Sequence, residues 1–375
     1  MPELPEVETI RIGLAKLLPS LEVKDVWHDW PKSFPNPPAN VNAFLIDAKI
    51  KEVRRRAKVL IIDLSTKYSL IIHLKMTGQL VFVDKNQQKL ETRKKKLVKK
   101  ANSQFPIPNS SEAGRFGGGH PTDSLIKKLP DKSTRVIIEF YPKKVSRGMG
   151  SSTIQGKGEQ RTESYMKYGE GAAQDLTQKR AKSASGAAGS ASRQAGAAHG
   201  PRLFFNDQRK FGWMRLLPTL EVPEIDFMKK VGPEPLEDDF TFEVFANRLA
   251  RRQKSSIKAA LLDQTVLAGV GNIYADESLY AARIHPATPV KSISKAKLAN
   301  LYYELRMILR LAIEAGGSTD KNYVDASGKK GSYLSFAKAF RKEGHPCPRC
   351  GTPIEKIRVA GRGTHICPHC QRLPK

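Results

Sequence analysis

The sequence contains no cysteine before position 347, and its four cysteines all lie between positions 347 and 370. This absence argues against a secreted protein stabilised by disulfides. No apolar run approaches the roughly 18 residues that a membrane-spanning helix needs. The N-terminus also lacks the features of a signal peptide, because glutamates stand where basic and apolar regions would be expected. We therefore expect a cytoplasmic, nucleoid-associated protein that has no membrane partner.

Acidic residues are scarce relative to basic ones. Lysine and arginine total 64 against 37 aspartates and glutamates, which leaves a formal charge of +27. Such an excess indicates a polyanionic partner, either nucleic acid or an anionic membrane surface. The lack of a spanning segment favours nucleic acid. With 375 residues, the chain is long enough for two or three domains.

The cysteines form two Cys-x2-Cys pairs. Cys347 and Cys350 are followed, after sixteen intervening residues, by Cys367 and Cys370. This spacing predicts one structural zinc ion, since four thiolate ligands leave no open coordination position for catalysis. Two disulfides or four free thiols are the alternative.

Apolar periodicity predicts an N-terminal helix over residues 5–18 and an antiparallel sheet or sandwich that packs against it. A proline-rich acidic linker at 218–239 precedes a helical half, and a zinc-held β-hairpin is expected beyond residue 337. The expected strands are 45–53, 58–64, 69–75, 134–141 and 202–206, and the expected helices are 240–252, 256–263, 273–282 and 298–313.

Two stretches interrupt the first half, at residues 86–131 and 143–200. Rich in lysine, glycine, alanine and serine, they bury too little apolar surface to offset their ordering entropy. We expect disordered insertions that act either as DNA-grazing tethers or as inert expansions. The predicted domains are a catalytic β-sandwich domain at 1–217 that carries both insertions, a linker at 218–239, a DNA-binding helical domain at 240–336 and a zinc finger at 337–375.

The first residues after Met1 carry the strongest chemical signal. A small residue at position 2 favours removal of the initiator, which would expose a secondary amine on Pro2. An α-amino group has a pKa of about 8 and is partly neutral in the cell. Such an amine can attack a carbonyl-like carbon to give a Schiff base, and the acid Glu3 lies beside it. An ordinary helix start is the alternative, because proline and glutamate both suit a first helical turn.

A glycine turn, Ala268-Gly269-Val270-Gly271-Asn272-Ile273, precedes the third predicted helix of the second half. The glycines let the backbone approach another group closely, and the helix that follows offers N–H donors to an anion. Asn272 can cap that helix or donate to a phosphate. Four nearby cations support a DNA-backbone clamp, although a plain helix C-cap would also explain the glycines. These cations are Arg251, Arg252, Lys254 and Lys258.

Two loop segments carry residue types that proteins insert into a duplex. Met76 follows a predicted strand, and Arg209 and Phe211 lie in a charged loop. Apolar wedges and cationic groups of this kind unstack base steps and fill the space left by an extruded base. Burial of Met76 and Phe211 in a core is the alternative for each of them.

Six segments in order resemble the formamidopyrimidine-DNA glycosylase family, whose members excise oxidised purines. The resemblance covers roughly residues 1–84 and 202–375, and Leu4 favours this branch over the sister family endonuclease VIII, which usually has glycine there. Gln208 departs from the family's usual proline, and Lys210 and Ser133 also replace usual residues. The segments are MPELPEVETIRIGL at the start, RRRAKVLIIDL at 54–64, IIHLKMTGQL at 71–80, DQRKFG at 207–212, LLDQTVLAGVGNIYADESLYAARIHP at 261–286 and GRGTHICPHCQ at 361–371.

The resemblance implies an α+β multidomain fold: an N-terminal helix with an antiparallel β-sandwich, a helix-two-turn-helix domain and a C-terminal zinc-finger hairpin. It also implies a bifunctional glycosylase and abasic-site lyase that uses β,δ-elimination, acting as a monomer on damaged double-stranded DNA. The implied catalytic residues are the nucleophile Pro2, the acid Glu3, the β-elimination lysine Lys58 and the δ-elimination arginine Arg362. Glu6 would hold the everted lesion under a loop at 317–332. Implied DNA contacts are His73, Lys258, Asn272 and Arg362 on the backbone and Met76, Arg209 and Phe211 in the vacated space.

Three alternatives stay open at this point. One is an endonuclease VIII-like glycosylase for oxidised pyrimidines, and another is a catalytically silent protein of the same fold that binds damage. A third, a zinc-ribbon protein without enzymatic activity, accounts for the cysteines and the charge but not for Pro2 and Glu3.

Overall fold

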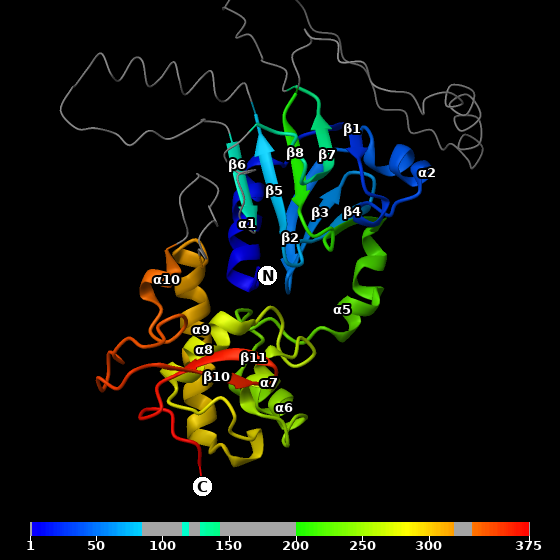
Figure 1. Cartoon of the computed structure of the whole chain (residues 1–375). Helices are drawn as coiled ribbons and strands as arrows, with labels where there is room; N and C mark the ends of the chain where they lie inside the picture. The colour runs from blue at the N-terminus through cyan, green and yellow to red at the C-terminus, as the bar shows by residue number, and fades with distance from the viewer. Residues whose placement is uncertain (1, 85–114, 120–127, 143–199, 319–331, 375) are drawn as a thin grey trace, which may run out of the picture. The chain divides into compact units, whose positions relative to one another are not determined.

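The computed structural model describes residues 2–84, 115–119, 128–142, 200–318 and 332–374. Two antiparallel sheets and the N-terminal helix α1 (Leu4–Leu17) make up the first part of the chain (Figure 1). One sheet has the order β1 (Val23–His28), β7 (Thr134–Phe140), β8 (Arg202–Asp207), β5 (Gly78–Val83), β6 (Arg115–Gly119). The other has the order β2 (Ile50–Arg56), β3 (Val59–Leu64), β4 (Tyr68–His73), β9 (Trp213–Pro218).

The two sheets and α1 share one hydrophobic core. Val7, Ile10 and Leu14, spaced for one helical face, pack with inward residues of both sheets, such as Leu60 and Phe205. Strand β3 is apolar on both faces because its outer side is covered as well. Its Val59 and Ile61 pack against the segment after β9, which contains the 3-10 turn η4 (Thr219–Glu224) and helix α5 (Asp226–Lys230).

The helical part contains α6 (Phe242–Ala250), α7 (Ile257–Leu262), α8 (Asn272–Ala281) and α9 (Lys295–Glu314) around a second core. Side-chain hydroxyls cap three of these helices: Thr241 caps α6, Ser256 caps α7 and Ser294 caps α9. Helix α9 ends before Gly316 and Gly317, whose φ angles of 75° and 84° suit glycine. The hairpin β10 (Glu355–Val359) and β11 (Arg362–Ile366) follows the short helix α10 (Tyr333–Phe336). These features confirm the predicted fold class.

Two sequence predictions need correction. Residues 45–49 are not part of the strand expected at 45–53, because a π-helical turn, η2 (Val41–Leu45), occupies its start and β2 begins only at Ile50. Strand β6 lies inside the stretch 86–131 that was expected to be disordered. Its glycines allow close packing, since a Cβ on Gly118 would lie 2.4 Å from Ile10 Cγ1. The rest of both predicted insertions lies largely outside the described residues.

The remaining short elements connect the larger ones. The linker expected at 218–239 begins within β9 and contains both η4 and α5, so it is partly helical. The 3-10 turn η1 (Pro31–Ser33) and helix α2 (Pro38–Asn40) lie between β1 and β2, and η5 (Val290–Ser292) precedes α9.

Candidate active site and nucleic-acid interface

The start of α1 meets the glycine turn before α8. The Leu4 N–H donates to the Gly269 carbonyl at 3.0 Å, and the Ile273 N–H donates to Glu3 Oε1 at 3.2 Å. Pro2 and Glu3 are both buried at this junction. The first residues of the chain are therefore anchored about 270 positions away in the sequence, as the Glu3 to Ile273 bond shows.

Glu3 is an acid that can hold a proton near neutral pH. Burial raises the pKa of its carboxyl to about 7, the charge of Lys58 opposes that rise and the charge of Glu6 adds to it. Its Oε2 atom is buried and has no hydrogen-bond partner among the described residues. A protonated carboxyl with one unengaged oxygen can donate to a substrate atom, which is what a general acid requires.

The two glycines of the turn make room for these N-terminal residues. A Cβ on Gly271 would lie 2.1 Å from Glu3 Cδ, and a Cβ on Gly269 would lie 2.6 Å from Leu4 Cβ. Gly269 also has φ at +77°, where a side chain is strained. The sequence predicts that the backbone of this turn approaches another group closely. In the structure that group includes the chain's own N-terminal residues.

Replacing Gly271 with alanine should therefore displace the Glu3 carboxyl. We expect the base excision that the resemblance implies to fall about 100-fold, because a shift of about 1 Å in a reacting group has an effect of that order. Single-turnover base release would measure the loss, and affinity for a duplex with a tetrahydrofuran abasic analogue should change little. An unchanged excision rate would show that Glu3 has no fixed role.

Lys58 lies in the same buried site. Its Nζ donates to the Val270 carbonyl at 3.0 Å. Burial lowers the pKa of its amine, Glu3 and Glu6 counter this effect, and the positive charge of Arg362 lowers the pKa further. A lysine with a depressed pKa is a better proton acceptor than an exposed one.

An unforeseen carboxylate, Glu234, holds the turn that carries Lys58. It pairs with Arg55 at 2.7 Å and Arg56 at 3.0 Å, and it accepts the Ala57 N–H. Glu234 is separated from Arg55 by 179 positions, so no local sequence pattern could have revealed the pair. Glu234 is thus a positioning residue for Lys58.

Glu6 is surrounded by protein donors. Its Oε1 accepts from the Tyr274 hydroxyl at 2.5 Å and from both the N–H and the hydroxyl of Ser318 at 2.8 Å. Its Oε2 accepts the Glu3 N–H at 2.8 Å. These bonds tie α1 to α8 and to the start of the loop expected to cover a lesion. Residues 319–331 of that loop lie outside the described residues.

The zinc-module hairpin presents Arg362, which is exposed at the start of β11. The carbonyl of the next residue, Gly363, accepts from Asn272 Nδ2 at 3.1 Å and from Lys258 Nζ at 3.3 Å. Arg362 is therefore held beside the first turn of α8, next to the residues that anchor Glu3.

Lys258 requires a correction. It was expected to contact the DNA backbone, but its side chain is fully buried and pairs with Asp276 at 2.5 Å. Its Nζ also donates to Thr364 Oγ1 at 2.7 Å, and Asp276 Oδ2 accepts the His365 N–H at 3.0 Å. This network joins α7, α8 and β11, so Lys258 positions Arg362 and has no surface to offer a phosphate. Lys258 is fully buried where the helices meet the hairpin, and the sequence around a single position does not reveal such burial.

The other clamp cations remain at the surface. Lys254, Arg251 and Arg252 are exposed in the α6–α7 connection, and Arg252 pairs with Asp263 at 2.7 Å. Lys254 stays available to a phosphate, whereas the two arginines border a basic cavity.

The three expected duplex-probing residues converge. Arg209 Nη1 lies 3.3 Å from Met76 Sδ and its guanidinium 4.9 Å from the centre of the Phe211 ring. Met76 is 41% exposed and Phe211 53% exposed, so neither belongs to a core. Buried Asp207, which the sequence did not single out, anchors the loop by accepting the Gly212 N–H at 2.7 Å.

His73 is neutral at physiological pH. Burial and the charges of Lys75 and Lys58 lower the pKa of its ring to about 3. Its Nδ1 accepts the Lys75 N–H at 3.0 Å, so the ring proton is assigned to Nε2. A neutral Nε2–H is a donor suited to a phosphate oxygen.

The four cysteines gather into one metal-binding cluster. Their sulfur atoms all lie within 4.8 Å of one another, and the residues are free thiols. Four thiols at this separation fit a tetrahedral zinc ion, and zinc so held has a structural role only. Cys347, Ile354 and Cys367 also pack against Tyr280 of α8.

Serine in place of Cys367 should release the zinc and weaken DNA binding, because Arg362 then loses its fixed hairpin. We expect the affinity for an abasic-site duplex near 0.1 M salt to fall about tenfold, the order that loss of one phosphate contact produces. The matched control is His369→Ala, an exposed residue between two ligands. Zinc-free protein that binds this duplex with unchanged affinity would contradict the role given to the hairpin.

Within the described ranges, no helix has the length and apolar character required to cross a bilayer.

Comparison with known proteins adds three domain matches. Residues 1–109 match the formamidopyrimidine-DNA glycosylase N-terminal domain and residues 231–323 its H2TH domain. Residues 344–373 match a zinc finger found in FPG and IleRS.

Full-length relatives and solved structures agree with these matches. A formamidopyrimidine-DNA glycosylase from Pelotomaculum thermopropionicum is 32% identical, with 100% of both chains covered. The same-named protein from Herpetosiphon aurantiacus is 33% identical, covering 99% of this chain and 100% of that one. A Lactococcus lactis Fpg complex with abasic-site DNA matches with TM-score 0.67, 26% identity and 99% of each chain covered. MutM (Fpg) from Thermus thermophilus matches with TM-score 0.65, 28% identity and 100% of each chain covered.

Proposed function

The chain belongs to the formamidopyrimidine-DNA glycosylase family, and from this premise we propose that it removes oxidised purines from duplex DNA and then cleaves the strand. The observation that carries the proposal is the buried Glu3 carboxyl, whose pKa of about 7 lets it act as an acid beside Pro2. Related solved structures contain DNA with an abasic site or with Fapy-dG, which supports damaged DNA as the substrate.

The first chemical step uses the N-terminal pair. The neutral amine of Pro2 forms a bond to C1′, and the bond between C1′ and the damaged base breaks. The base departs with the bonding electron pair and takes up the proton that the alkylated Pro2 nitrogen loses. Glu3 donates its proton to the sugar ring oxygen, so the ring opens and an iminium ion links Pro2 to C1′. No redox change occurs in this sequence.

The second stage cleaves the strand. The iminium acidifies the C2′ hydrogens, and loss of one proton expels the 3′ phosphate in a β-elimination. A further proton loss expels the 5′ phosphate in a δ-elimination. Lys58, whose pKa is lowered by burial, would accept a proton, and the cation Arg362 would stabilise a departing phosphate.

The remaining residues bind and reshape the duplex. His73, Asn272 and Lys254 would contact backbone phosphates, while Met76, Arg209 and Phe211 would enter the space left by the flipped nucleotide. Glu6 accepts two hydrogen bonds from Ser318, at the start of the loop expected to cover the lesion. Through that loop Glu6 would orient the everted base. The four cysteines would hold a zinc ion that keeps the Arg362 hairpin rigid.

We assign the catalytic domain to residues 1–217, the linker to 218–239, the DNA-binding helical domain to 240–336 and the zinc finger to 337–375. The protein would work as a monomer, because one chain carries every group that the chemistry needs. A DNA substrate would associate it with the nucleoid in the cytoplasm.

A panel of single-lesion duplexes tests the proposal, with base release and strand scission scored separately. We expect 8-oxoguanine and formamidopyrimidine to be released and the strand to be cut at both phosphates. Release of oxidised pyrimidines alone would indicate an endonuclease VIII-like activity. Tight binding without base release would indicate a silent damage-binding protein.

A further inference from the structure

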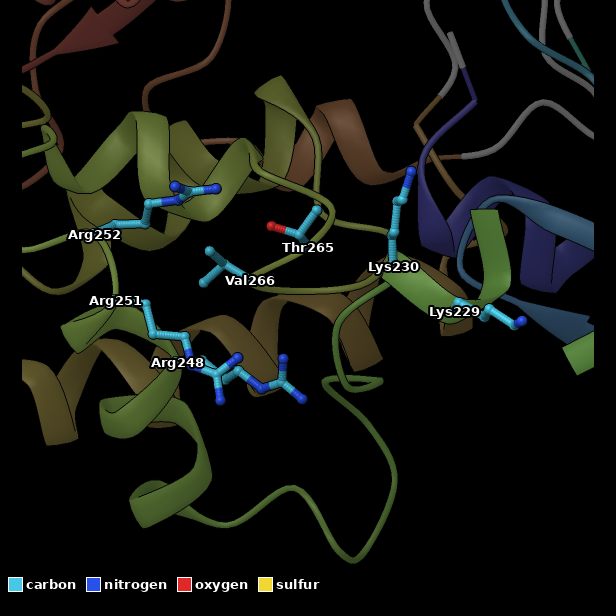
Figure 2. A pocket seen from close by; sticks show the side chains of 7 residues that line it. All are labelled: Lys229, Lys230, Arg248, Arg251, Arg252, Thr265 and Val266. Carbon is cyan, nitrogen blue, oxygen red and sulfur yellow. The ribbon is translucent and has the colours of Figure 1, made fainter. Parts of the chain in front are cut away.

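A strongly basic cavity lies outside the active site. It measures about 330 Å³ and lies between the linker helix α5, the C-terminal end of α6 and the turn after α7 (Figure 2). Five of its seven lining residues are cationic, and only two of the five, Arg251 and Arg252, belong to the clamp cations expected from the sequence. The five are Lys229, Lys230, Arg248, Arg251 and Arg252, joined by Thr265 and Val266.

Three of these five charges have no ion-pair partner in the described part of the chain. Lys229 pairs with Glu224 at 2.9 Å, and Arg252 pairs with Asp263 at 2.7 Å. The other three, Lys230, Arg248 and Arg251, have no such partner within those ranges. Like charges around one hollow repel one another, and an entering anion removes that cost.

Helix dipoles explain only part of this arrangement. Cations are favoured in the last turn of a helix, where Lys229, Lys230 and Arg248 are found. The dipole does not explain why cations from two separate helices line a single cavity. Arginine forks and lysine ammonium groups together match the oxygens of phosphodiesters.

The cavity wall continues into the active-site turn. Thr265 and Val266 directly follow Gln264, whose Nε2 donates to the Val270 carbonyl at 2.8 Å. That carbonyl also accepts from Lys58 Nζ at 3.0 Å. A phosphate in the cavity would therefore be bound by a segment rigidly connected to the catalytic lysine.

We propose that this cavity is a second phosphodiester-binding site, which takes backbone phosphates of duplex DNA away from the lesion. The proposal rests on the proposed function for its choice of polyanion, and an acidic peptide of a partner protein is the competing occupant. The phosphates could come from the flank of the bound duplex or from a second duplex.

The test is the double variant Arg248→Gln, Arg251→Gln, in which side chains of similar size replace two half-buried or exposed cations. The slope of log K against log salt on undamaged 40-base-pair DNA should become shallower by nearly two, since each lost phosphate contact changes it by about 0.9. With equal affinities at 1 M salt, the affinity of the double variant near 0.1 M salt should be roughly 60-fold lower by the same rule. The control is Lys297→Gln, Arg310→Gln, which removes two exposed charges from α9 and should have a smaller effect.

Three further measurements interpret the result. If the double variant loses as much affinity for a 12-base-pair duplex as for the 40-base-pair duplex, the flank of the bound duplex is not the source of the phosphates. If the double variant transfers more slowly between duplexes at high competitor concentration, the result supports a second duplex as the source. An unchanged salt slope on every DNA would overturn the proposal. If the double variant loses poly-glutamate binding and the control variant keeps it, the cavity would be assigned to an acidic protein. If the unaltered protein lacks excision altogether, the proposed function fails, but the salt-slope comparison still tests the cavity.

Discussion

Glutamine in place of Glu3 should lower the rate of base excision from an 8-oxoguanine duplex by about 10²- to 10⁴-fold, the usual range for loss of a general acid. The amide keeps the shape of the side chain and can still accept the Ile273 N–H, but it has no proton to give to the sugar ring. Cleavage of a preformed abasic site should be much less affected, because its sugar already opens without the enzyme. Single-turnover rates for both substrates measure this difference.

The pH profile provides a second readout of the same variant. Burial raises the pKa of the Glu3 carboxyl to about 7, so its protonated fraction decreases as the pH rises through neutrality. Excision by the unaltered protein should therefore decline on the alkaline side, and that decline should be absent from the residual activity of Glu3→Gln. Equal loss of excision and abasic-site cleavage, with no change in profile, would assign Glu3 to folding instead of proton donation.

Inserting a lysine between Met1 and Pro2 should abolish covalent catalysis. The large side chain prevents removal of the initiator, so the Pro2 nitrogen stays in an amide and cannot attack C1′. Borohydride should trap the processed protein on 8-oxoguanine DNA as a stable adduct and should trap none of the extended protein. The strand-cleavage rate should fall by at least the 10³-fold that loss of a nucleophile commonly causes.

Two controls make this experiment decisive. Binding of both proteins to a tetrahydrofuran duplex shows whether the insertion has merely blocked access to DNA. Mass spectrometry establishes which protein retains Met1. Normal lesion removal by a protein with an intact initiator would contradict Pro2 as the nucleophile.

Local patterns predicted much of this molecule. The 3-4-3 apolar spacing after Pro5 predicted α1, the apolar run at 58–64 predicted β3, and the cysteine spacing predicted the metal cluster. The resemblance assigned Glu3, Lys58 and Asn272 to one site, and the structure places all three around one turn. The joining of Met76, Arg209 and Phe211 followed from the resemblance alone, since sequence separation does not report proximity.

The errors and omissions concern tertiary context. Lys258 was assigned to DNA contact because it belongs to a basic cluster and because the resemblance implies that contact. In the structure Asp276 and Thr364 compensate its charge in the interior, where lysine is seldom found. The glycines of β6 resembled a disordered tract because composition does not record a helix packed against them. Glu234 was not singled out because its partners Arg55 and Arg56 come from a distant strand.

The distance in sequence between Glu3 and its anchor has a consequence during protein synthesis. A ribosome must release Ile273 before the carboxyl acquires its buried setting, and it must release Gly363 before Arg362 is fixed beside α8. A nascent or prematurely terminated chain therefore has Pro2 without the buried setting of Glu3 and without the fixed position of Arg362.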